Sequence, residues 1–394
     1  MRIGLYHEPV HTDGRTFDTY GGYARYVLEF ARHFEQVTVF APTTRDPTYF
    51  SGCSLDAPNV TIAPLPYFAT HVQAYRHAGS LVHIFRQHCD SLDVINARGT
   101  APLAYVLWWL TRKRGVPFMY HFSSDPFEMI ARSPKYRGLY RQFARTAYGF
   151  EFAIQKYIMR RNYSFSDGSA ISARLQRYTP NVEPIVLSTL QEADYYLRED
   201  CCTGRPVRVL YVGYLREGKG LGDLIEAVGQ LRRAGRDVEL ELVGEGELRA
   251  PLQAHASRLG LEPQVHFRGY VTLGPPLNEF YNTSDIFALP SLSEGSPRVI
   301  LEALGHSLPV IATPVGNIAE TLGDGQRGVL VPLNDPTALA TGIARVIDDA
   351  ELRRQCIRLG YAFAREHGLD RFVARMAKKA CELIAQRRGG AAPC

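Results

Sequence analysis

The sequence predicts an α/β protein built from two doubly wound domains, on two observations. The chain has 394 residues, which is more than one ordinary hydrophobic core accommodates. Each half also contains two short apolar runs separated by a polar loop and a helical pattern, and such strand–loop–helix–strand units build parallel sheets. The runs are Ile3–Tyr6 and Val37–Ala41 in the first half, and Ile286–Leu289 and Val310–Thr313 in the second.

The first of these units places a pair of glycines before a helix. After the strand Ile3–Tyr6, residues 7–20 form a predicted polar loop, which leads through Gly21 and Gly22 into a helical run over Ala24–Phe34. Paired glycines at the mouth of a helix let the backbone approach a phosphate closely. A simple flexible turn is the competing interpretation of the same residues.

Further strands are expected in the first half, among them Val60–Pro64, Asp93–Asn96 and Pro117–His121, with an apolar helix over Pro102–Arg112. His121 ends the last of these strands. Its side chain is therefore expected at the carboxyl edge of the sheet, where ligands bind in open α/β folds. A single histidine is more often structural than functional, so a structural role is the alternative.

A basic and aromatic segment, Arg132–Arg161, stands apart from the rest of the first half. Arg137, Arg141 and Arg145 recur at helical spacing on one predicted face. A helix of this kind suits an anionic membrane surface, and a solvated face is the competing interpretation. Nucleic acid is not expected as a partner, because no binding motif accompanies the charge. The basic residues are Arg132, Lys135, Arg137, Arg141, Arg145, Lys156, Arg160 and Arg161.

The second half opens with a strand over Val207–Val212 and a glycine-rich loop. That loop, Gly213–Gly220, reads G-x4-G-K-G and is one residue short of a P-loop. A P-loop needs Ser or Thr after the lysine to hold Mg²⁺, so a P-loop-like nucleotide hydrolase is the weaker alternative. The next strand, Glu239–Val243, ends in Gly244-Glu245-Gly246, which lacks the third glycine of a dinucleotide fingerprint.

The segment 285–316 holds the second unit of strand, loop, helix and strand. Ile286–Leu289 is followed by a polar loop over residues 291–296 and by a helix. Ser296 and Pro297 mark the helix start, as an N-cap serine and a proline at the first helical position. A helix N-terminus beside the carboxyl edge of a sheet offers free N–H groups to an anion.

Two acids interrupt the apolar pattern of this segment. Glu294 lies in the loop and Glu302 lies among apolar helix residues. Carboxylates at such an edge accept hydrogen bonds from hydroxyl groups, so the segment suits a ligand with a phosphate end and a polyol end, such as a sugar nucleotide. Taken singly, Glu294 as a turn cap and Glu302 as a solvated acid are the simpler interpretations.

Composition and charge indicate a globular protein with a basic first half. Hydrophobic residues make up 45% and charged residues 22% of the chain, as in soluble domains. Residues 1–190 hold 21 Lys and Arg against 14 Asp and Glu, which favours an anionic partner or a plain solvated surface. The most apolar window, Ala101–Leu110, falls far short of the ~20 residues of a membrane span. The seven cysteines show no paired spacing and the chain opens on a strand, so a cytoplasmic location is expected.

The pattern Glu294-Gly295 and Glu302-Ala303, followed by Pro309–Ala312, resembles the glutamate signature of family-4 retaining glycosyltransferases, the glycosyl transferases group 1. The resemblance implies the GT-B fold, in which two Rossmann-like doubly wound domains face each other across a cleft. It places an acceptor-binding domain at residues 1–195, a linker at 196–206 and a nucleotide-sugar-binding domain at 207–370. A C-terminal helix and tail, 371–394, would pack back on the first domain.

The resemblance also implies the reaction. A nucleotide diphosphate sugar, with UDP favoured over GDP, would donate its sugar to an acceptor hydroxyl with retention of configuration, in glycolipid or polysaccharide biosynthesis. No cofactor is expected beyond that co-substrate, and no metal, because the chain has no Asp-x-Asp pair. A lipid-linked acceptor is one option for the hydroxyl, and a peripheral position at the inner membrane face, through Arg132–Arg161, is one option for the protein. A sucrose-synthase-like or phosphorylase-like GT-B enzyme and a catalytically inactive binding protein are the rivals.

The residues implied by the resemblance fall into two sets. The catalytic set comprises His121, Lys219 and Glu294. Tyr214 departs from the family, which usually has Arg there, and Arg216 is expected to reach the diphosphate instead. The donor-binding set comprises Gly21, Gly22, Gly213, Arg216, Lys219, Gly244, Tyr270, Glu294, Gly295, Ser296, Pro297, Arg298 and Glu302.

Overall fold

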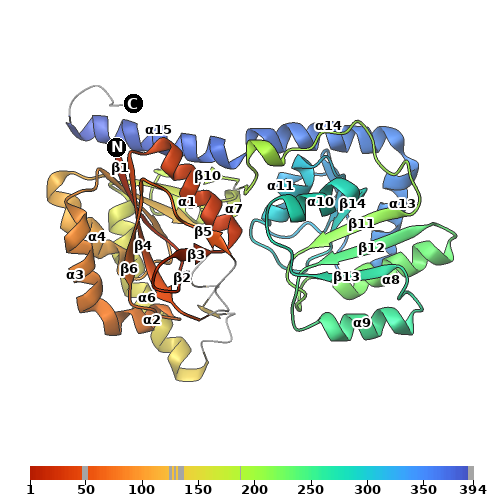
Figure 1. The fold of residues 1–394 in the computed structure, drawn as a ribbon, viewed down its shortest axis with the longest axis horizontal. Helices are drawn as coiled ribbons and strands as arrows, with labels where there is room; N and C mark the ends of the chain where they lie inside the picture. The colour runs from red at the N-terminus through yellow and green to blue at the C-terminus, as the bar shows by residue number, and fades with distance from the viewer. Residues whose placement is uncertain (47–51, 124–126, 128–129, 132–136, 187, 389–394) are drawn as a thin grey trace. The chain divides into compact units, whose positions relative to one another are not determined.

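The computed structural model describes residues 1–46, 52–123, 127, 130–131, 137–186 and 188–388, and the chain divides into two compact units (Figure 1). The first unit comprises Met1–Val186 and Asp370–Cys394, and the second comprises Leu187–Leu369. The chain therefore leaves the first unit after Val186 and returns to it with its last helix. Both units are layered α/β structures in which helices cover parallel sheets.

The first unit is built on parallel strands in the order β10-β9-β8-β7-β1-β4, with β6 pairing on β4. The strand order reverses between β1 and β7, which is the switch point of a doubly wound sheet. The strands are β1 (Arg2–Tyr6), β4 (Gln36–Thr44), β6 (Val60–Leu65), β7 (Val94–Arg98), β8 (Phe118–Phe122), β9 (Tyr163–Asp167) and β10 (Val182–Ile185). The helices are α1 (Gly21–His33), α2 (His71–Ala74), α3 (Ala78–Cys89), α4 (Ala104–Thr111), α6 (Gly138–Met159), α7 (Ser169–Gln176) and α15 (Leu369–Arg388).

An antiparallel extension occupies the segment predicted to be a polar loop over residues 7–20. It contains β2 (Val10–Thr12) and β3 (Phe17–Thr19), and β5 (Cys53–Ser54) pairs on β3. The turn between β2 and β3 is held by Asp13, whose Oδ1 accepts hydrogen bonds from the backbone N–H groups of Arg15 and Thr16 at 2.7 and 2.8 Å. The loop prediction was wrong because Asx-turn chemistry, rather than apolar alternation, defines this hairpin.

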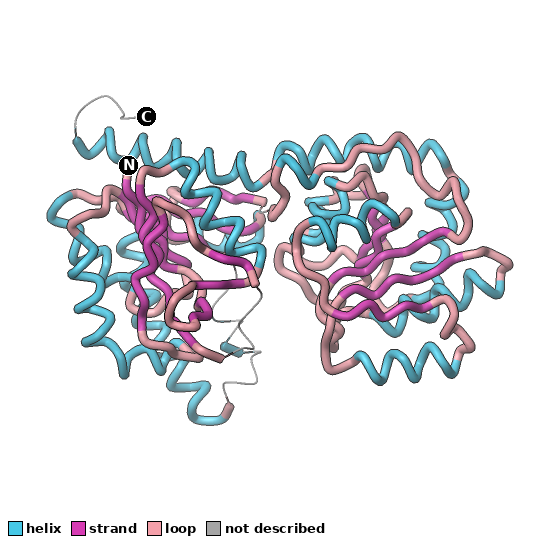
Figure 2. Tube along the Cα trace, in the orientation of Figure 1, coloured by secondary structure: helices cyan, strands magenta, loops and turns pink. Residues whose placement is uncertain are grey.

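The second unit is a six-stranded parallel sheet in the order β13-β12-β11-β14-β15-β16. This is the order 3-2-1-4-5-6 of a dinucleotide-binding domain, with its switch point between β11 and β14. The strands are β11 (Val207–Val212), β12 (Val238–Val243), β13 (Val265–Gly269), β14 (Ile286–Leu289), β15 (Val310–Ala312) and β16 (Gly328–Leu330). Figure 2 shows these strands with helices around them. The helices of this unit are α8 (Leu221–Arg233), α9 (Arg249–Arg258), α10 (Pro275–Thr283), α11 (Arg298–Gly305), α12 (Ile318–Thr321), α13 (Pro336–Asp348) and α14 (Ala350–Glu366).

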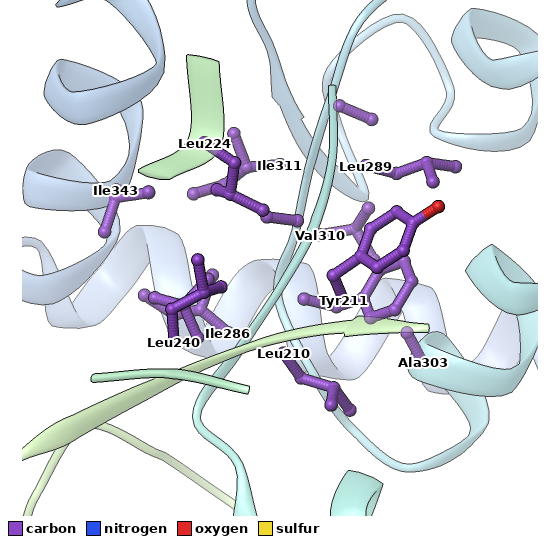
Figure 3. Close-up of a cluster of buried hydrophobic side chains, with 14 of the residues drawn as sticks. Leu210, Tyr211, Leu224, Leu240, Ile286, Leu289, Ala303, Val310, Ile311 and Ile343 are labelled. Atoms are coloured by element: carbon purple, nitrogen blue, oxygen red, sulfur yellow. The ribbon is translucent and has the colours of Figure 1, made fainter. Parts of the chain in front are cut away.

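The core of the second unit fixes the strand ends that carry the loops described below. Leu210, Leu240, Ile286 and Ile311 are fully buried and meet helix side chains such as Ala303 (Figure 3). Strands that helices cover on both faces have mostly apolar sequences. For this reason the sequence predicted β11 and β14 at their observed bounds. Because the strands are buried and rigid, the loops that follow them start from fixed positions.

The unit boundaries differ from the sequence prediction of a domain end at 195 and a linker over 196–206. That segment lies inside the second unit. Arg198 ties it there, since its guanidinium donates hydrogen bonds to the carbonyl groups of Tyr281, Ser284 and His306 at 2.8–3.2 Å. At the other end of the chain, α15 runs beside α1 in the first unit (Figure 1), and the rings of Phe372 and Tyr26 lie 6.2 Å apart.

Candidate functional site

Two loops meet at the switch point of the second unit. One follows β11 and spans Gly213–Gly220, and the other follows β14. The backbone N–H of Leu292 donates to the carbonyl of Gly218 at 2.8 Å. Gly220 has a φ of +66°, and a Cβ there would lie 2.0 Å from the carbonyl oxygen of Pro290. A glycine is therefore required for the two loops to touch.

Lys219 and Glu294 bring the two loops together chemically. The Nζ of Lys219 lies 2.5 Å from Oε1 of Glu294, and the Oγ of Ser291 donates to the same oxygen at 2.7 Å. The two charged side chains are only 12% and 11% exposed. The hydroxyl of Thr313 in turn donates a hydrogen bond to the carbonyl of Ser291. The predicted catalytic residues Lys219 and Glu294 thus form one partly buried ion pair at the sheet edge.

Two further cations lie on the same pair of loops. Arg216 is exposed on the loop after β11, and Arg298 is the first residue of α11. Within the described residues, neither guanidinium forms a hydrogen bond or an ion pair. The first N–H groups of a helix also have no intrahelical acceptor and carry the positive end of its dipole. This edge of the sheet therefore concentrates positive charge that an anion can neutralise.

The start of α11 differs from the predicted serine cap. The helix begins at Arg298, and its N-cap is Pro297, which makes no side-chain capping bond. Ser296 is occupied elsewhere, because its Oγ accepts a hydrogen bond from Nδ2 of Asn317 at 2.9 Å. The N–H of Asn317 donates to the carbonyl of Gly295 at 3.0 Å. The loop after β14 is thus anchored to the loop after β15, and the N–H groups at the helix start stay free of a side-chain cap.

Glu302 lies inside the second unit and is only 6% exposed. The Oη of Tyr281 donates to its Oε2 at 2.9 Å, and the hydroxyl of Thr189 donates to its Oε1. Burial, followed by the Glu302 charge, raises the pKa of Tyr281 well above its usual range, so the phenol stays a donor. The simple solvated-acid interpretation is therefore wrong. Thr189 and Tyr281 carry no sequence signal that links them to Glu302.

The glycines of the donor-binding set allow loops to pack against each other. Gly244, after β12, has a φ of +140°, and a Cβ there would lie 1.9 Å from the carbonyl oxygen of Gly213. The N–H of Gly213 donates to the carbonyl of Val243 at 3.0 Å. Two exposed tyrosines follow at this edge, Tyr214 at 73% and Tyr270 at 62% exposure. Contact of these residues with a ligand stays a prediction.

His121 lies on β8 in the first unit and is 4% exposed. Its Nε2 lies 2.7 Å from Oδ1 of Asp167 on the neighbouring strand β9. Its ring also packs against Phe372 of α15, with centroids 5.8 Å apart. The sequence analysis did not identify Asp167, because a single acid at the end of a strand carries no motif. The carboxylate fixes the orientation of the imidazole through that contact.

A second histidine, His7, lies beside His121 with ring centroids 6.0 Å apart. Its Nε2 lies 2.5 Å from Oδ1 of Asn96, which also accepts a hydrogen bond from Oη of Tyr26 at 3.4 Å. Burial, followed by the charge of His121, holds the pKa of His7 well below its usual value. His7 is therefore a neutral hydrogen-bond donor. The sequence analysis missed it because it assigned this residue to a polar loop.

Gly21 and Gly22 are the first residues of α1, rather than part of a loop before it. Tyr20 is the N-cap, and its carbonyl accepts hydrogen bonds from the N–H groups of Tyr23 and Ala24 at 3.0 and 3.1 Å. The sequence predicted the helical run over Ala24–Phe34, after the two glycines, which are poor helix formers. At the first turn this penalty is small, and the glycine N–H groups there have no intrahelical acceptor.

The basic segment predicted over Arg132–Arg161 forms α6 from Gly138 onward, and Arg132 and Lys135 lie outside the described residues. Arg137 is the extended N-cap, so the predicted helical face shared with Arg141 and Arg145 is wrong for Arg137. No helix in the described ranges has the length and apolar character of a membrane span.

One group of possible metal ligands occurs within the described residues, away from the loops. Glu239 and Glu241 on β12 and His266 on β13 bring ligand atoms within 4.8 Å of one another. Arg268 donates to both carboxylate oxygens of Glu241, at 2.5 and 2.9 Å. Those oxygens are therefore already engaged by a cation.

The two doubly wound units define a GT-B protein, and the second unit has the strand order of a dinucleotide-binding domain. The chain belongs to glycosyltransferase family 4, the glycosyl transferases group 1. The family model for "Glycosyl transferases group 1" matches residues 203–363, and that for "Glycosyltransferase Family 4" matches residues 20–161.

Curated relatives match parts of the chain. The D-inositol 3-phosphate glycosyltransferase of Paenarthrobacter aurescens is 31% identical over 42% of this chain and 41% of the relative. The alpha-D-kanosaminyltransferase of Streptomyces kanamyceticus is 32% identical over 38% of this chain, so the chain spans only 39% of that relative. A GDP-mannose-dependent alpha-(1-6)-phosphatidylinositol monomannoside mannosyltransferase of Mycolicibacterium smegmatis is 31% identical over 62% of this chain and 66% of the relative.

Solved structures match nearly the whole chain. The sucrose-phosphate synthase of Thermosynechococcus elongatus has a TM-score of 0.72 at 20% identity and covers 98% of this chain and 100% of its own. The lipopolysaccharide glycosyltransferase WaaG has a TM-score of 0.66 at 17% identity, with coverage of 96% and 99%. Anabaena HepE in complex with UDP has a TM-score of 0.68 at 18% identity, with the same coverage. At these identities the matches show the fold.

Proposed function

We propose that the protein transfers a sugar from a nucleotide diphosphate sugar to an acceptor hydroxyl, with retention of the anomeric configuration and without a metal ion. The proposal rests on the Lys219–Glu294 ion pair at the switch point of the second unit, beside Arg216 and Arg298, which make no ion pair with any residue that the structure describes. An anionic leaving group needs such preorganised positive charge, and a polyol needs a carboxylate acceptor.

Each residue of this edge has a role in the proposal. Lys219, Arg216, Arg298 and the first turn of α11 neutralise the diphosphate and the negative charge that develops as it leaves. Lys219 and Ser291 both contact Oε1 of Glu294. The other carboxylate oxygen, Oε2, accepts hydrogen bonds from the sugar hydroxyls. Glu302, one turn or more into α11, accepts from the ribose hydroxyls on the lone pairs that its two protein donors leave unused.

The acceptor is proposed to bind the first unit beside His121. The polar group that the structure describes there comprises His121, Asp167, His7 and Asn96. We propose that His121 contacts the transferring sugar or the acceptor, with Asp167 holding its ring in place. Gly21 and Gly22 contribute first-turn N–H groups of α1 as a further anion contact.

The donor nucleotide is proposed to be UDP rather than GDP, and the product a glycolipid or polysaccharide precursor. HepE is a UDP complex, whereas the mycobacterial relative is named as GDP-mannose-dependent, so both bases belong in the test. Other relatives are named for amylovoran and lipopolysaccharide core biosynthesis. These names favour an acceptor hydroxyl on a lipid-linked or polymeric glycan.

A thermal-shift panel with UDP, GDP, ADP and their sugar conjugates tests the proposal, since a ligand that binds only the folded state raises its stability. We expect a shift with one diphosphate family that is lost in Lys219→Met. Nucleotide release should then require an acceptor glycan. Release with fructose or phosphate alone would instead indicate the sucrose-synthase-like or phosphorylase-like alternative, and Mg²⁺-dependent hydrolysis of ATP would indicate a hydrolase.

A further inference from the structure

A stripe of exposed aromatic side chains runs along α6. Phe143, Phe150 and Tyr157 recur every seven residues and are 59%, 67% and 47% exposed. Residues seven apart lie on one face of a helix, two turns from each other. Single exposed apolar residues are ordinary, but an aligned series of large ones marks an interaction surface.

The stripe continues onto α4. The ring of Trp108 on α4 meets Tyr157 on α6 edge-on, with centroids 5.9 Å apart, and its neighbour Trp109 is 50% exposed. Between the two helices lies a hollow of about 390 Å³. Apolar and aromatic side chains line it, namely Tyr105, Val106, Trp108, Trp109 and Ile154. The two helices thus present one continuous apolar face, called here the α4–α6 face.

Positive charge borders the α4–α6 face. The guanidinium of Arg112 lies 4.6 Å from the ring centre of Trp109, and that of Arg161 lies 3.8 Å from that of Tyr157. Segments 104–114 and 138–161 contain a single acid, Glu151, which is fully buried and engaged by Tyr75. The other basic residues of these segments are Lys113, Arg114, Arg141, Arg145, Lys156 and Arg160.

We propose that the α4–α6 face docks on the surface of an anionic lipid bilayer. Trp109, Phe150 and Tyr157 enter the interfacial layer, where amphipathic rings are favoured, and Arg112 and Arg161 meet the headgroup phosphates. Each basic residue near such a surface adds to the attraction. The absence of exposed acids on segments 104–114 and 138–161 favours an anionic lipid over a second copy of this net-basic unit.

This inference rests on the proposed function only in one respect, since docking would bring the enzyme to a lipid-linked acceptor. It also moves the predicted membrane contact. The sequence pointed to a face made of Arg137, Arg141 and Arg145, whereas the exposed aromatics and their arginines lie along α4 and the Phe143–Arg161 side of α6. Lipid binding is therefore expected to depend on Trp109 and Phe150 more than on Arg137.

The two tryptophans of the chain, Trp108 and Trp109, both belong to this face, so intrinsic fluorescence reports on it directly. We expect vesicles enriched in phosphatidylglycerol to shift the emission to the blue and brominated lipid to quench it. Pure phosphatidylcholine vesicles should do neither, and salt should weaken the effect. Equal responses to both vesicle types, or none, would overturn the proposal.

Variants separate docking from folding and from catalysis. Phe150→Ser and the pair Arg112→Gln with Arg161→Gln should each weaken vesicle co-sedimentation by ~10-fold or more, which corresponds to ~1.4 kcal/mol. Leu259→Ser, at a residue 40% exposed in the second unit, is the matched control. The stabilisation by nucleotide should be the same in these three variants as in the wild type. If nucleotide does not stabilise the wild type at all, that result counts against the proposed function and not against membrane docking. Unchanged co-sedimentation of Phe150→Ser, or a wild-type dimer in sedimentation velocity that Phe150→Ser dissociates, would overturn the docking proposal.

Discussion

Lys219 and Glu294 lie 75 positions apart in the chain, yet their charged atoms are 2.5 Å apart at the switch point of the second sheet. Two buried strands, β11 and β14, deliver them from adjacent positions in that sheet. Since both side chains are mostly shielded from water, removing one of them leaves the charge of the other without a partner to offset its burial. The pair therefore couples the structure of the two loops to any chemistry that they perform.

Replacing Lys219 by alanine should lower turnover by ~10²–10³-fold, the typical effect of one preorganised donor to a developing negative charge, or ~2.7–4 kcal/mol. Glu294→Ala should impair both sugar binding and transfer. Steady-state kinetics with the donor identified by thermal shift would measure both. Lys219→Arg keeps the charge and is the control. Equal activity of Lys219→Ala and the wild type would show that the lysine has no role in the reaction.

Glu302→Gln should lower the free energy of unfolding by ~1–3 kcal/mol, because a buried carboxylate is lost as the acceptor for two hydroxyls. It should also weaken the affinity for the donor, if Glu302 binds the ribose as proposed. Chemical denaturation and nucleotide titration measure these two effects separately. Tyr281→Phe removes one donor while keeping the carboxylate, so it should lower stability and preserve affinity. A donor dissociation constant unchanged in Glu302→Gln would leave Glu302 with a purely structural role.

How far the sequence predicts this site depends on the range of the interactions involved. Strands such as Ile286–Leu289 are visible as apolar runs because burial on both faces dictates their composition. The start of α11 was misplaced, since Ser296 bonds to Asn317 of another loop rather than to its own helix. The partners of Glu302 and His121, Thr189 and Asp167, are set by tertiary packing and have no local pattern.

The stability of the first unit should depend on His7 between neutral and mildly acidic pH. Its folded pKa is depressed below 6.5, so below pH ~6.5 the unfolded chain binds a proton that the folded chain excludes. Stability is therefore full above the unfolded pKa and falls as the pH drops toward the folded pKa, by up to ~1.4 kcal/mol per pH unit. We expect the thermal midpoint to drop between pH 7.5 and ~5.5, and less so in His7→Gln. His83→Gln, at an exposed site on α3, is the control, and parallel pH profiles of His7→Gln and wild type would contradict the prediction.

Activity should survive EDTA. The cations that the chain supplies at the loop edge are Lys219, Arg216 and Arg298, and the N-terminus of α11 adds partial positive charge. Dialysis against EDTA followed by an assay in metal-free buffer measures this. Loss of activity that Mg²⁺ or Mn²⁺ restores would show that a metal, rather than this set, neutralises the diphosphate.

The geometry at Glu294 bears on the stereochemical course. Retention by double displacement needs a free carboxylate nucleophile, with the acid/base ~5–5.5 Å away in typical hydrolases. In this protein Oε1 of Glu294 is held by Lys219 and Ser291, and the ion pair lowers the nucleophilicity of the carboxylate. The contacts of this edge instead favour stabilisation of the leaving diphosphate.

The anomeric configuration of the sugar should therefore be retained without a covalent glycosyl-enzyme. In the proposed mechanism, Lys219, Arg216 and Arg298 stabilise the leaving phosphate as the bond to the diphosphate breaks, and the phosphate oxygen takes the proton of the acceptor hydroxyl on the same face of the sugar. The acceptor oxygen then bonds to the anomeric carbon on the side from which the diphosphate left. NMR of the product gives its anomer, and mass spectrometry of the acid-quenched enzyme detects any adduct. The expected result is a retained anomer with an unmodified chain, and either an inverted product or a sugar attached to Glu294 would refute this mechanism.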